Sequence, residues 1–280
     1  MSLLKESCIL IYDIALNDRF DLKKNSVLLN GPQALVRLCL IQSERDKLKG
    51  LSTSGYITGY RGSPLGAVDQ QFNRAKNILT DRKVFFREAL NEDLAATAIW
   101  GAQQANIRGD GATDGVYSLW YGKGPGVDRS GDVFRHANLA GTDPNGGVLV
   151  AMGDDHTGES STALHQSEYA LIDSMIPIFS PAGVQELLDF GVLGWELSRF
   201  AGVWVGLKCM KDTVEVTEVV DGSVERIEVK KPVFSFPEEG VQIRTNDLAA
   251  IQEERLHKVK IPAVKAFARA NNLNKVVFSK

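Results

Sequence analysis

The fold of this chain is decided by the turn Gly59-Tyr60-Arg61-Gly62-Ser63-Pro64-Leu65-Gly66 and, further on, by Asn91-Glu92-Asp93-Leu94-Ala95-Ala96-Thr97-Ala98. The turn follows an apolar pair that predicts a strand. It precedes residues 64–79, whose apolar side chains recur every three or four positions and predict a helix. A strand, a tight turn and a helix N-terminus leave backbone N–H groups free to meet a ligand. In the second motif Glu92 begins a helix of small residues, where the helix dipole favours a carboxylate. The residues alone therefore indicate a ligand pocket with one acid in it.

Each of these features also has a plain structural interpretation. A Gly-rich turn before a helix is more often a tight connection than a binding site. Glu92 serves equally well as an N-terminal helix charge. The Ser63 hydroxyl is expected equally to cap a helix that starts at Pro64, and Tyr60 suits packing better than chemistry.

The rest of the chain alternates between strand and helix patterns. Strands are expected at 26–29, 55–58, 84–86, 115–121, 148–152, 176–179 and 203–208, helices at 32–49, 64–79, 92–106, 132–139, 167–175, 181–200 and 248–270, and a loop at 122–126. This order predicts an α/β fold with a mainly parallel sheet flanked by helices. Ligands bind at the carboxyl ends of such strands. The Gly-rich turn, Glu92, the 122–126 loop and the turn at Asp154-Asp155 should therefore share one site.

We divide the chain into three parts. Residues 1–24 form an N-terminal arm, and residues 25–212 form the α/β module. Residues 213–280 are expected to hold a hairpin excursion at 213–238 and a C-terminal helix that leads to a following domain missing from this chain.

Composition excludes several functions. The 280 residues are 44% apolar and carry a net charge of −3 with no basic stripe, so neither nucleic acid nor an anionic membrane is expected as a partner. No apolar run reaches the ~20 residues that span a bilayer, and no signal peptide is recognisable. Cys8, Cys39 and Cys209 are isolated, so they build neither a zinc ribbon nor an iron–sulfur ligand set. A reduced, cytoplasmic setting is expected.

Three motifs together resemble one enzyme family. They are the Gly59–Gly66 turn, the Asn91–Ala98 segment, and Met152-Gly153-Asp154-Asp155-His156 with Glu159-Ser160-Ser161. They resemble the long fused form of the indolepyruvate ferredoxin oxidoreductases, within the thiamine diphosphate-dependent 2-oxoacid:ferredoxin oxidoreductases. The likeness runs from about Asp18 onward and is confined to the N-terminal, pyrimidine-binding module of that enzyme. The resemblance therefore implies the thiamine diphosphate-binding fold.

The resemblance implies roles for particular residues. In the family a glutamate hydrogen-bonds N1′ of the cofactor pyrimidine and promotes removal of the thiazolium C2 proton; Glu92 matches it and is the expected catalytic residue. Tyr60, Gly62, Ser63 and Pro64 are the other expected cofactor-binding residues. Ser63 matches a Thr or Ser in a Tyr-Pro-x-Thr-Pro type turn, although Arg61-Gly62 replaces Pro-x here.

A second segment resembles another cofactor-side loop of the family. It runs from Gly126 through Asp132 to Gly141 and contains His136. Ser63, Asp132 and His136 are therefore the expected substrate-side residues. A surface or capping role for His136 remains an equal alternative.

Two patterns mimic metal sites. Asp154-Asp155-His156, with Glu159 and His165, matches no standard ligand spacing, so no metal is expected there. Gly109-Asp110-Gly111 with Asn138 mimics the motif that holds magnesium and the diphosphate in thiamine enzymes. That motif should follow a buried strand and open a helix, whereas here it follows polar residues 103–106 and precedes a strand. The diphosphate motif is then expected to be absent from this chain.

The resemblance implies the N-terminal part of an enzyme that oxidatively decarboxylates an aryl or branched 2-oxo acid with coenzyme A. Thiamine diphosphate would be shared with a diphosphate-binding partner module, and magnesium and iron–sulfur clusters would enter only through missing modules. A transfer module, ferredoxin and a dimeric assembly are the other expected partners, and the chain alone is expected to be inactive. The alternative is a non-catalytic regulatory or assembly subunit that keeps the fold. A hydrolase built on Asp154 and His156 lacks a Gly-x-Ser-x-Gly elbow.

Overall fold

The computed structural model describes residues 14–159, 163–276 and 278–279. Its centre is a six-stranded sheet in which every neighbouring pair of strands runs parallel. In spatial order the strands are β3 (Val84–Glu88), β2 (Ser54–Gly59), β4 (Val116–Lys123), β5 (Val148–Asp154), β7 (Trp204–Met210) and β6 (Ile178–Phe179). All residues of β5 are buried, as expected for a central strand covered on both faces. The predicted fold class is confirmed.

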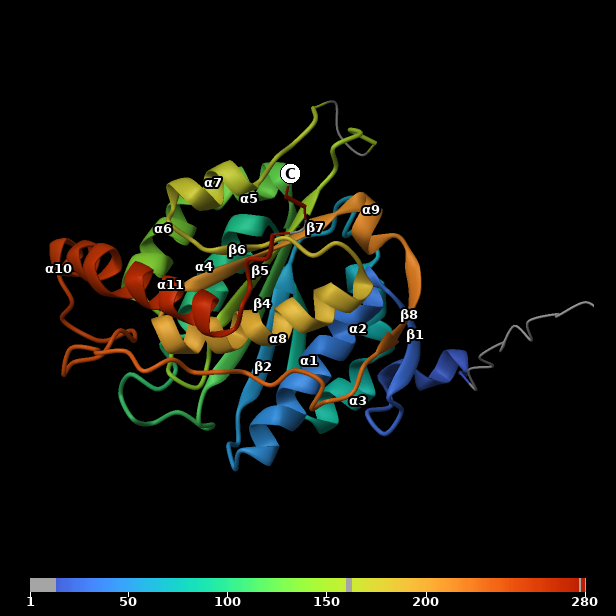
Figure 1. Cartoon of the computed structure of the whole chain (residues 1–280), viewed down its shortest axis with the longest axis horizontal. Helices are drawn as coiled ribbons and strands as arrows, with labels where there is room; N and C mark the ends of the chain where they lie inside the picture. The colour runs from blue at the N-terminus through green and yellow to red at the C-terminus, as the bar shows by residue number, and fades with distance from the viewer. Residues whose placement is uncertain (1–13, 160–162, 277, 280) are drawn as a thin grey trace, which may run out of the picture.

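Helices cover both faces of the sheet (Figure 1). One layer holds α1 (Gly31–Leu48), α2 (Val68–Arg74), α3 (Lys76–Asp81) and α8 (Val184–Ala201). The other holds α4 (Glu92–Ala102), α5 (Gly124–Arg129), α6 (Gly131–Ala140) and α7 (Glu168–Asp173). The side chains of β4 alternate between the two layers: Tyr117, Leu119 and Tyr121 face the first layer, and Trp120 faces the second.

Two elements around the Gly-rich turn differ from the expectation. The helix predicted from Pro64 begins only at Val68, because residues 60–62 are irregular and residues 63–67 form turns. The Ser63–Pro64 peptide bond is cis. The loop predicted at 122–126 is also wrong. Strand β4 includes Gly122 and Lys123, and α5 begins directly at Gly124 with Pro125 in its first turn. Glycine and proline are therefore used for close packing and helix initiation rather than for a flexible connection.

The hairpin expected at 213–238 does not form. After the short helix α9 (Lys211–Val214), strand β8 (Thr217–Asp221) pairs antiparallel with β1 (Ser26–Asn30) in a separate two-stranded sheet. The pairing of β8 with β1 cannot be predicted from local pattern, because hairpin signals join only neighbouring segments and these two strands are far apart in the sequence. Residues on both sides of the boundary expected at 212 thus share one small sheet, although the three-part domain division itself stays a prediction.

The fully buried side chain of Arg37, on α1, connects this helix to backbone just before β1 and just after β8. Arg37 donates hydrogen bonds to the carbonyls of Arg19 (2.8 Å), Lys24 (2.6 Å) and Gly222 (2.8 Å). Burial lowers the pKa of Arg37 to about 10. The part of the N-terminal arm from residue 14, which includes the 3-10 helix η1 (Leu16–Phe20), is therefore packed against the module; residues 1–13 lie outside the described ranges.

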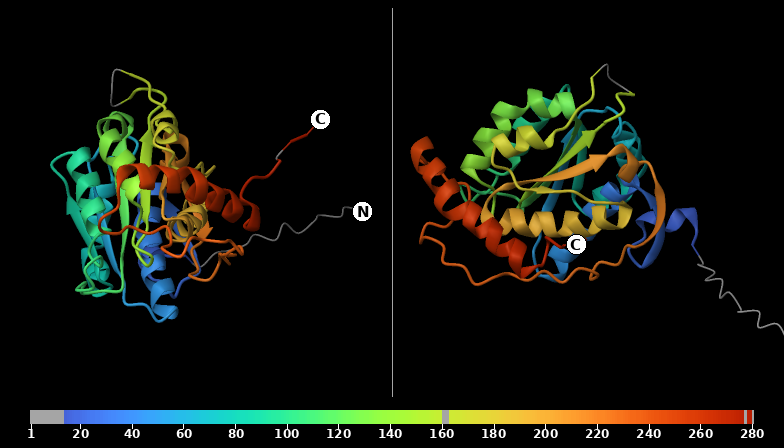
Figure 2. Two further views of the ribbon diagram at one scale, coloured as in Figure 1. Left: turned by 90° about the vertical axis from the view of Figure 1, so that its left-hand side faces the viewer. Right: turned by 45° about the horizontal axis from the view of Figure 1, so that its top comes forward.

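The C-terminal helix predicted at 248–270 is confirmed, with one irregular turn. It consists of α10 (Ala249–Arg255), the π-helical turn η2 (Leu256–Lys260) and α11 (Ile261–Ala270). Figure 2 shows this run crossing from one helical layer to the other, because α10 contacts α6 and α11 contacts α8. No helix among the described residues is long and apolar enough to cross a membrane.

Candidate functional site

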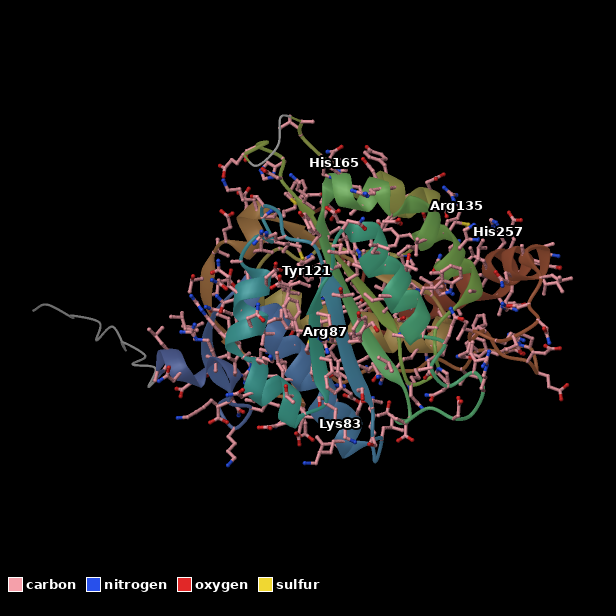
Figure 3. The ribbon with its side chains drawn as sticks, turned by 180° about the vertical axis from the view of Figure 1, so that it is seen from behind. Lys83, Arg87, Tyr121, Arg135, His165 and His257 are labelled. Carbon is pink, nitrogen blue, oxygen red and sulfur yellow. The ribbon has the colours of Figure 1, made fainter. Side chains whose placement is uncertain are left out.

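The candidate site lies at the carboxyl edge of the parallel sheet. Gly59 at the end of β2 stands opposite Glu88 of β3 and Tyr121 of β4, and Lys123 stands opposite Gly153 of β5. Figure 3 shows the two ends of the sheet: Lys83, before β3, lies at the lower end and His165 at the upper, carboxyl end. The turns that follow β2, β3, β4 and β5 therefore meet at one edge, as the strand order predicts.

The Gly-rich turn approaches its neighbours without room for side chains. A Cβ at position 59 would lie 2.0 Å from the Tyr121 carbonyl oxygen, and a Cβ at position 62 would lie 2.7 Å from the Lys123 side chain. Ser63 does not cap the following helix, because Ala67 is the N-cap of α2 and its side chain accepts no hydrogen bond. The capping interpretation of Ser63 is therefore wrong, and its hydroxyl is not committed to that helix.

Glu92 is the first residue of α4. The helix is capped by Asn91, whose side-chain oxygen accepts a hydrogen bond from Leu94 N at 2.8 Å. The Trp120 indole donates to the Glu92 carbonyl at 3.0 Å and fixes the first turn against β4. Glu92 is only 8% exposed. Across residues 14–159, 163–276 and 278–279 no side chain forms a hydrogen bond or an ion pair with its carboxylate.

Two glycines of the β4–α5 connection form the floor under this carboxylate. A Cβ at position 126 would lie 2.4 Å from Cγ of Glu92 and 2.7 Å from its Oε1. A Cβ at position 122 would lie 3.3 Å from the same Cγ. The Glu92 side chain thus rests on the bare backbone of these two glycines. Such a cradle suits a flat ring that must come close to the carboxylate.

A buried hydrogen bond supports the Gly-rich turn from below. The Tyr121 hydroxyl, fully buried, donates to the carboxylate of Asp69 on α2. Burial raises the pKa of Asp69, and the nearby Glu88 raises it further, while Tyr121 and Arg61 lower it. Burial and the hydrogen bond to Asp69 raise the pKa of Tyr121. This pair holds α2 and β4 together rather than offering a titratable group to solvent.

The two other expected substrate-side residues lie elsewhere. Asp132 and His136 are on α6, with side chains 87% and 56% exposed, and their carboxylate and imidazole lie 3.6 Å apart. The His136 ring stacks on Trp100 of α4 with centroids 6.3 Å apart. The structure therefore brings Ser63 and Glu92 to the same sheet edge, whereas Asp132 and His136 form an exposed pair on the helical layer.

The residues considered as a metal cluster each interact with a different partner. Asp154 accepts hydrogen bonds from the backbone N–H and the hydroxyl of Ser167. His156 faces Asp212 at 3.4 Å, His165 faces Asp128 at 2.8 Å, and Glu159 pairs with Lys211. No group of three or more His, Cys, Asp or Glu side chains suited to a metal occurs in the described part of the chain.

The residues that mimic the diphosphate motif, Gly109-Asp110-Gly111, do not lie at the same edge of the sheet as Glu92. Residues 109–111 belong to the irregular segment before β4, at the amino end of that strand and therefore at the sheet edge opposite Glu92. The Asn138 side chain is fully buried and donates to the carbonyls of Ser174 and Met175, while its oxygen accepts from Trp204 N. Asn138 therefore has a structural role in α6.

Sequence reasoning missed two contributors to the site. Gly126 was placed in a cofactor-side loop, but its contact with Glu92 was not foreseen; the glycines at every second position from 122 to 126 were the available signal. His165 was considered only as a metal ligand. Its contact with α5 depends on a long connection after β5, and nothing in the local pattern indicates it.

No family model matches the chain. The chain is 24% identical over 224 residues to the indolepyruvate oxidoreductase subunit IorA of Methanothermobacter marburgensis, a match that covers 80% of this chain and 34% of that protein. It thus spans about a third of the length of that curated relative. A solved 2-oxoglutarate:ferredoxin oxidoreductase from Magnetococcus marinus, with 2-oxoglutarate, coenzyme A and succinyl-CoA bound, matches 90% of this chain and 46% of its own, with a TM-score of 0.64 and 14% identity. The resemblance to the 2-oxoacid:ferredoxin oxidoreductases that was stated from the sequence is confirmed.

Proposed function

Since the chain is a relative of the 2-oxoacid:ferredoxin oxidoreductases, we propose that it supplies the pyrimidine-binding half of a thiamine diphosphate site in such an enzyme. In this proposal the complete enzyme oxidatively decarboxylates an aryl or branched 2-oxo acid of the indolepyruvate type. Other modules supply the diphosphate site, magnesium, the iron–sulfur clusters and the transfer of electrons to ferredoxin. We place the protein in the cytoplasm.

One observation carries the proposal. Glu92 is an almost fully buried acid, it has no partner among the described side chains, and the bare backbone of Gly122 and Gly126 lies directly beside it. The Glu92 oxygens are not among the fully buried unpaired side-chain atoms of the described residues, so a ligand can reach the carboxylate and pair with it. The residues therefore fit an aminopyrimidine, a flat heterocycle that needs one acid and close access.

Within this site the residues of the chain have distinct tasks. Glu92 would share a proton with the pyrimidine N1′ through one of its carboxylate oxygens. Tyr60, Gly62, Ser63 and Pro64 form the turn that would border the ring, and the Ser63 hydroxyl would face the substrate. Thiamine diphosphate, when bound, supplies the electron sink for decarboxylation; the protein positions it and sets the electrostatics.

The outer face of α4 is suited to cover this site with a partner module. Leu94, Ala98 and Gly101 are exposed on it, one helical turn apart, and Leu90 just before the helix is 86% exposed. Small residues on a helix let another backbone approach closely. We infer that the diphosphate-binding module packs here, beside Glu92, and that the half-site is completed only in the assembly.

The rival function is a non-catalytic regulatory or assembly subunit with the same fold. It gives no reason for an unpaired buried acid at the sheet edge. It would be favoured if the assembled enzyme worked equally well without the Glu92 carboxylate.

The proposal is tested in an assembly of this chain with its diphosphate-binding and cluster-bearing partner modules. Ferredoxin reduction that depends on a 2-oxo acid is measured for the wild type, Glu92→Gln and the neighbouring first-turn acid variant Asp93→Asn. Loss of a group that moves a proton lowers rates by roughly 10²–10⁴-fold. We expect that loss for Glu92→Gln alone, and an active Glu92→Gln assembly would refute the proposal.

A further inference from the structure

The six-residue helix α5 is held between two side chains on opposite sides. Gly126 lies against the Glu92 carboxyl group, as described above. Two residues earlier, Gly124 lies against an imidazole: a Cβ at position 124 would be 1.9 Å from Nδ1 of His165. Figure 3 shows His165 beside the start of this helix at the carboxyl end of the sheet. The position of the Gly126 backbone under the Glu92 carboxylate therefore depends on how His165 packs against α5.

His165 is bound to α5 by a hydrogen bond as well as by packing. Its Nε2 lies 2.8 Å from a carboxylate oxygen of Asp128, on the same helix. The His165 side chain is 17% exposed, whereas Asp128 is 62% exposed. The ring thus covers the first turn of α5 and grips its second turn through Asp128.

His165 is itself anchored to the end of β5. Two residues later, the Ser167 N–H donates to both oxygens of Asp154 at 3.1 Å, and the Ser167 hydroxyl donates to one of them at 2.5 Å. Ser167 Oγ also lies 3.5 Å from Nδ1 of His165. Asp154 is the last residue of β5 and is 2% exposed. Asp154, Ser167, His165 and Asp128 therefore form one route of contacts from the sheet to α5.

A helix as short as α5 needs such support. Fewer than two turns are only marginally stable in isolation, and glycines at 124 and 126 add conformational freedom to the unbound segment. The residue that follows the helix contributes one further hydrogen bond, from the Ser130 hydroxyl to the Gly126 carbonyl at 2.8 Å. Functional groups lose efficiency when their supports shift by a fraction of an ångström.

We propose that His165 is a positioning residue for Glu92: by clamping α5 to the end of β5, it fixes the backbone of Gly126 beneath the Glu92 carboxylate. The role in catalysis rests on the proposed function, but the clamp itself is a property of this chain. It places an imidazole behind the site, where it need not touch substrate or cofactor.

The clamp is tested first on the chain alone by amide hydrogen exchange of Val127 to Ser130. His165→Leu removes the hydrogen bond, while His165→Gln keeps a nitrogen donor for Asp128. His156→Gln is the control, because His156 pairs with Asp212, 3.4 Å away, and among the described residues it forms no hydrogen bond or ion pair with α5. Opening of a locally supported segment changes exchange directly. We expect exchange at least roughly tenfold faster in His165→Leu, and near wild-type rates in the other two.

A second variant guards against a general folding defect. Gly124→Ala leaves His165 in the chain but places a methyl group where its ring lies, so it should speed exchange in α5 as His165→Leu does. Unchanged exchange in both His165→Leu and Gly124→Ala would overturn the clamp.

Measurements on the assembled enzyme then distinguish the positioning role of His165 from the proposed function. If thiamine diphosphate binds the wild-type assembly, His165→Leu should weaken that binding and lower kcat, with little change in KM for the 2-oxo acid and rescue by His165→Gln. Equal kcat and cofactor affinity in wild type and His165→Leu would refute the positioning role. If the wild-type assembly does not bind the cofactor, the proposed function fails, whereas the exchange result still decides whether the clamp exists.

Discussion

Gly126 is the residue whose replacement tests the site most locally. In Gly126→Ala the added methyl group would lie 2.4 Å from Cγ of Glu92, so either the helix α5 or the carboxylate must move. Overpacking of this kind costs about 1–3 kcal/mol. We expect a modest loss of stability in urea unfolding, together with loss of thiamine diphosphate binding by the assembly.

The control for this variant is another helical glycine close by. A Cβ at Gly131, the first residue of α6, would meet nothing within 4 Å. Gly131→Ala should therefore keep both stability and cofactor binding. Equal binding in Gly126→Ala and wild type would mean that the floor under Glu92 is not part of the site.

At the scale of single residues the sequence was informative only where a residue stands in a motif. Glu92 was located from its place at the start of a small-residue helix, and the structure puts it at the expected edge of the sheet. Its catalytic role stays a prediction. His136 and Asp132 were named from the same kind of likeness, yet they are exposed on α6. Side-chain direction depends on packing between helices, which a local motif does not contain.

At the scale of elements, the C-terminal helical run holds α6 in place through one lysine. Lys260 is fully buried in the π-helical turn and donates to the carbonyls of Asn138 (3.1 Å) and Leu139 (2.9 Å), at the C-terminus of α6. These are carbonyls that a helix end leaves without intrahelical partners. Burial lowers the pKa of Lys260 to about 7; Arg255 and Arg244 lower it further and Asp247 opposes them.

This arrangement predicts how stability changes with pH. The ordinary pKa of 10.5 applies in the unfolded chain. Through Lys260, the unfolded chain therefore binds more protons than the folded one between about pH 7 and 10.5, and this lysine makes the free energy of unfolding rise with pH. The measurement stays below about pH 9, because burial raises the pKa of the Cys39 and Cys209 thiols and these groups act in the opposite direction above it. The slope approaches about 1.4 kcal/mol per pH unit. Lys260→Met should remove this rise in urea unfolding series at successive pH values.

The matched control is the exposed lysine two positions earlier. Among the described residues Lys258 pairs only with Glu254, and its side chain is 72% exposed. Lys258→Met should keep the wild-type slope. A Lys260→Met protein whose stability rises as steeply as that of the wild type would show that Lys260 does not titrate on unfolding.

Most elements could be predicted because hydrophobic periodicity reports burial directly. The central strands and helices α1 and α8 lie within a few residues of the predicted ranges. Errors occur where a long-range contact decides the outcome. The 217–221 segment became a strand by pairing with β1, and residues 122–123 stayed in β4 because β5 continues beside them. Neither partner can be recognised from the segment itself.

At the scale of the whole molecule, the chain presents one half of a site. The parallel sheet brings the Gly-rich turn, Glu92 and α5 to one edge, and the exposed face of α4 beside them has no cover within the described chain. The chain also spans only part of its relatives. The central claim is therefore that this edge binds the pyrimidine only when a diphosphate-binding module closes it.

The most direct test is isothermal titration calorimetry with thiamine diphosphate and magnesium. It is performed on this chain alone, on the partner module alone, and on their mixture, with wild-type and Glu92→Gln chains. The account predicts binding in the wild-type mixture that is much weaker with Glu92→Gln, and none with this chain alone. Binding by this chain alone would contradict the half-site and reopen the Gly109–Gly111 motif. A wild-type mixture without binding would favour the non-catalytic subunit.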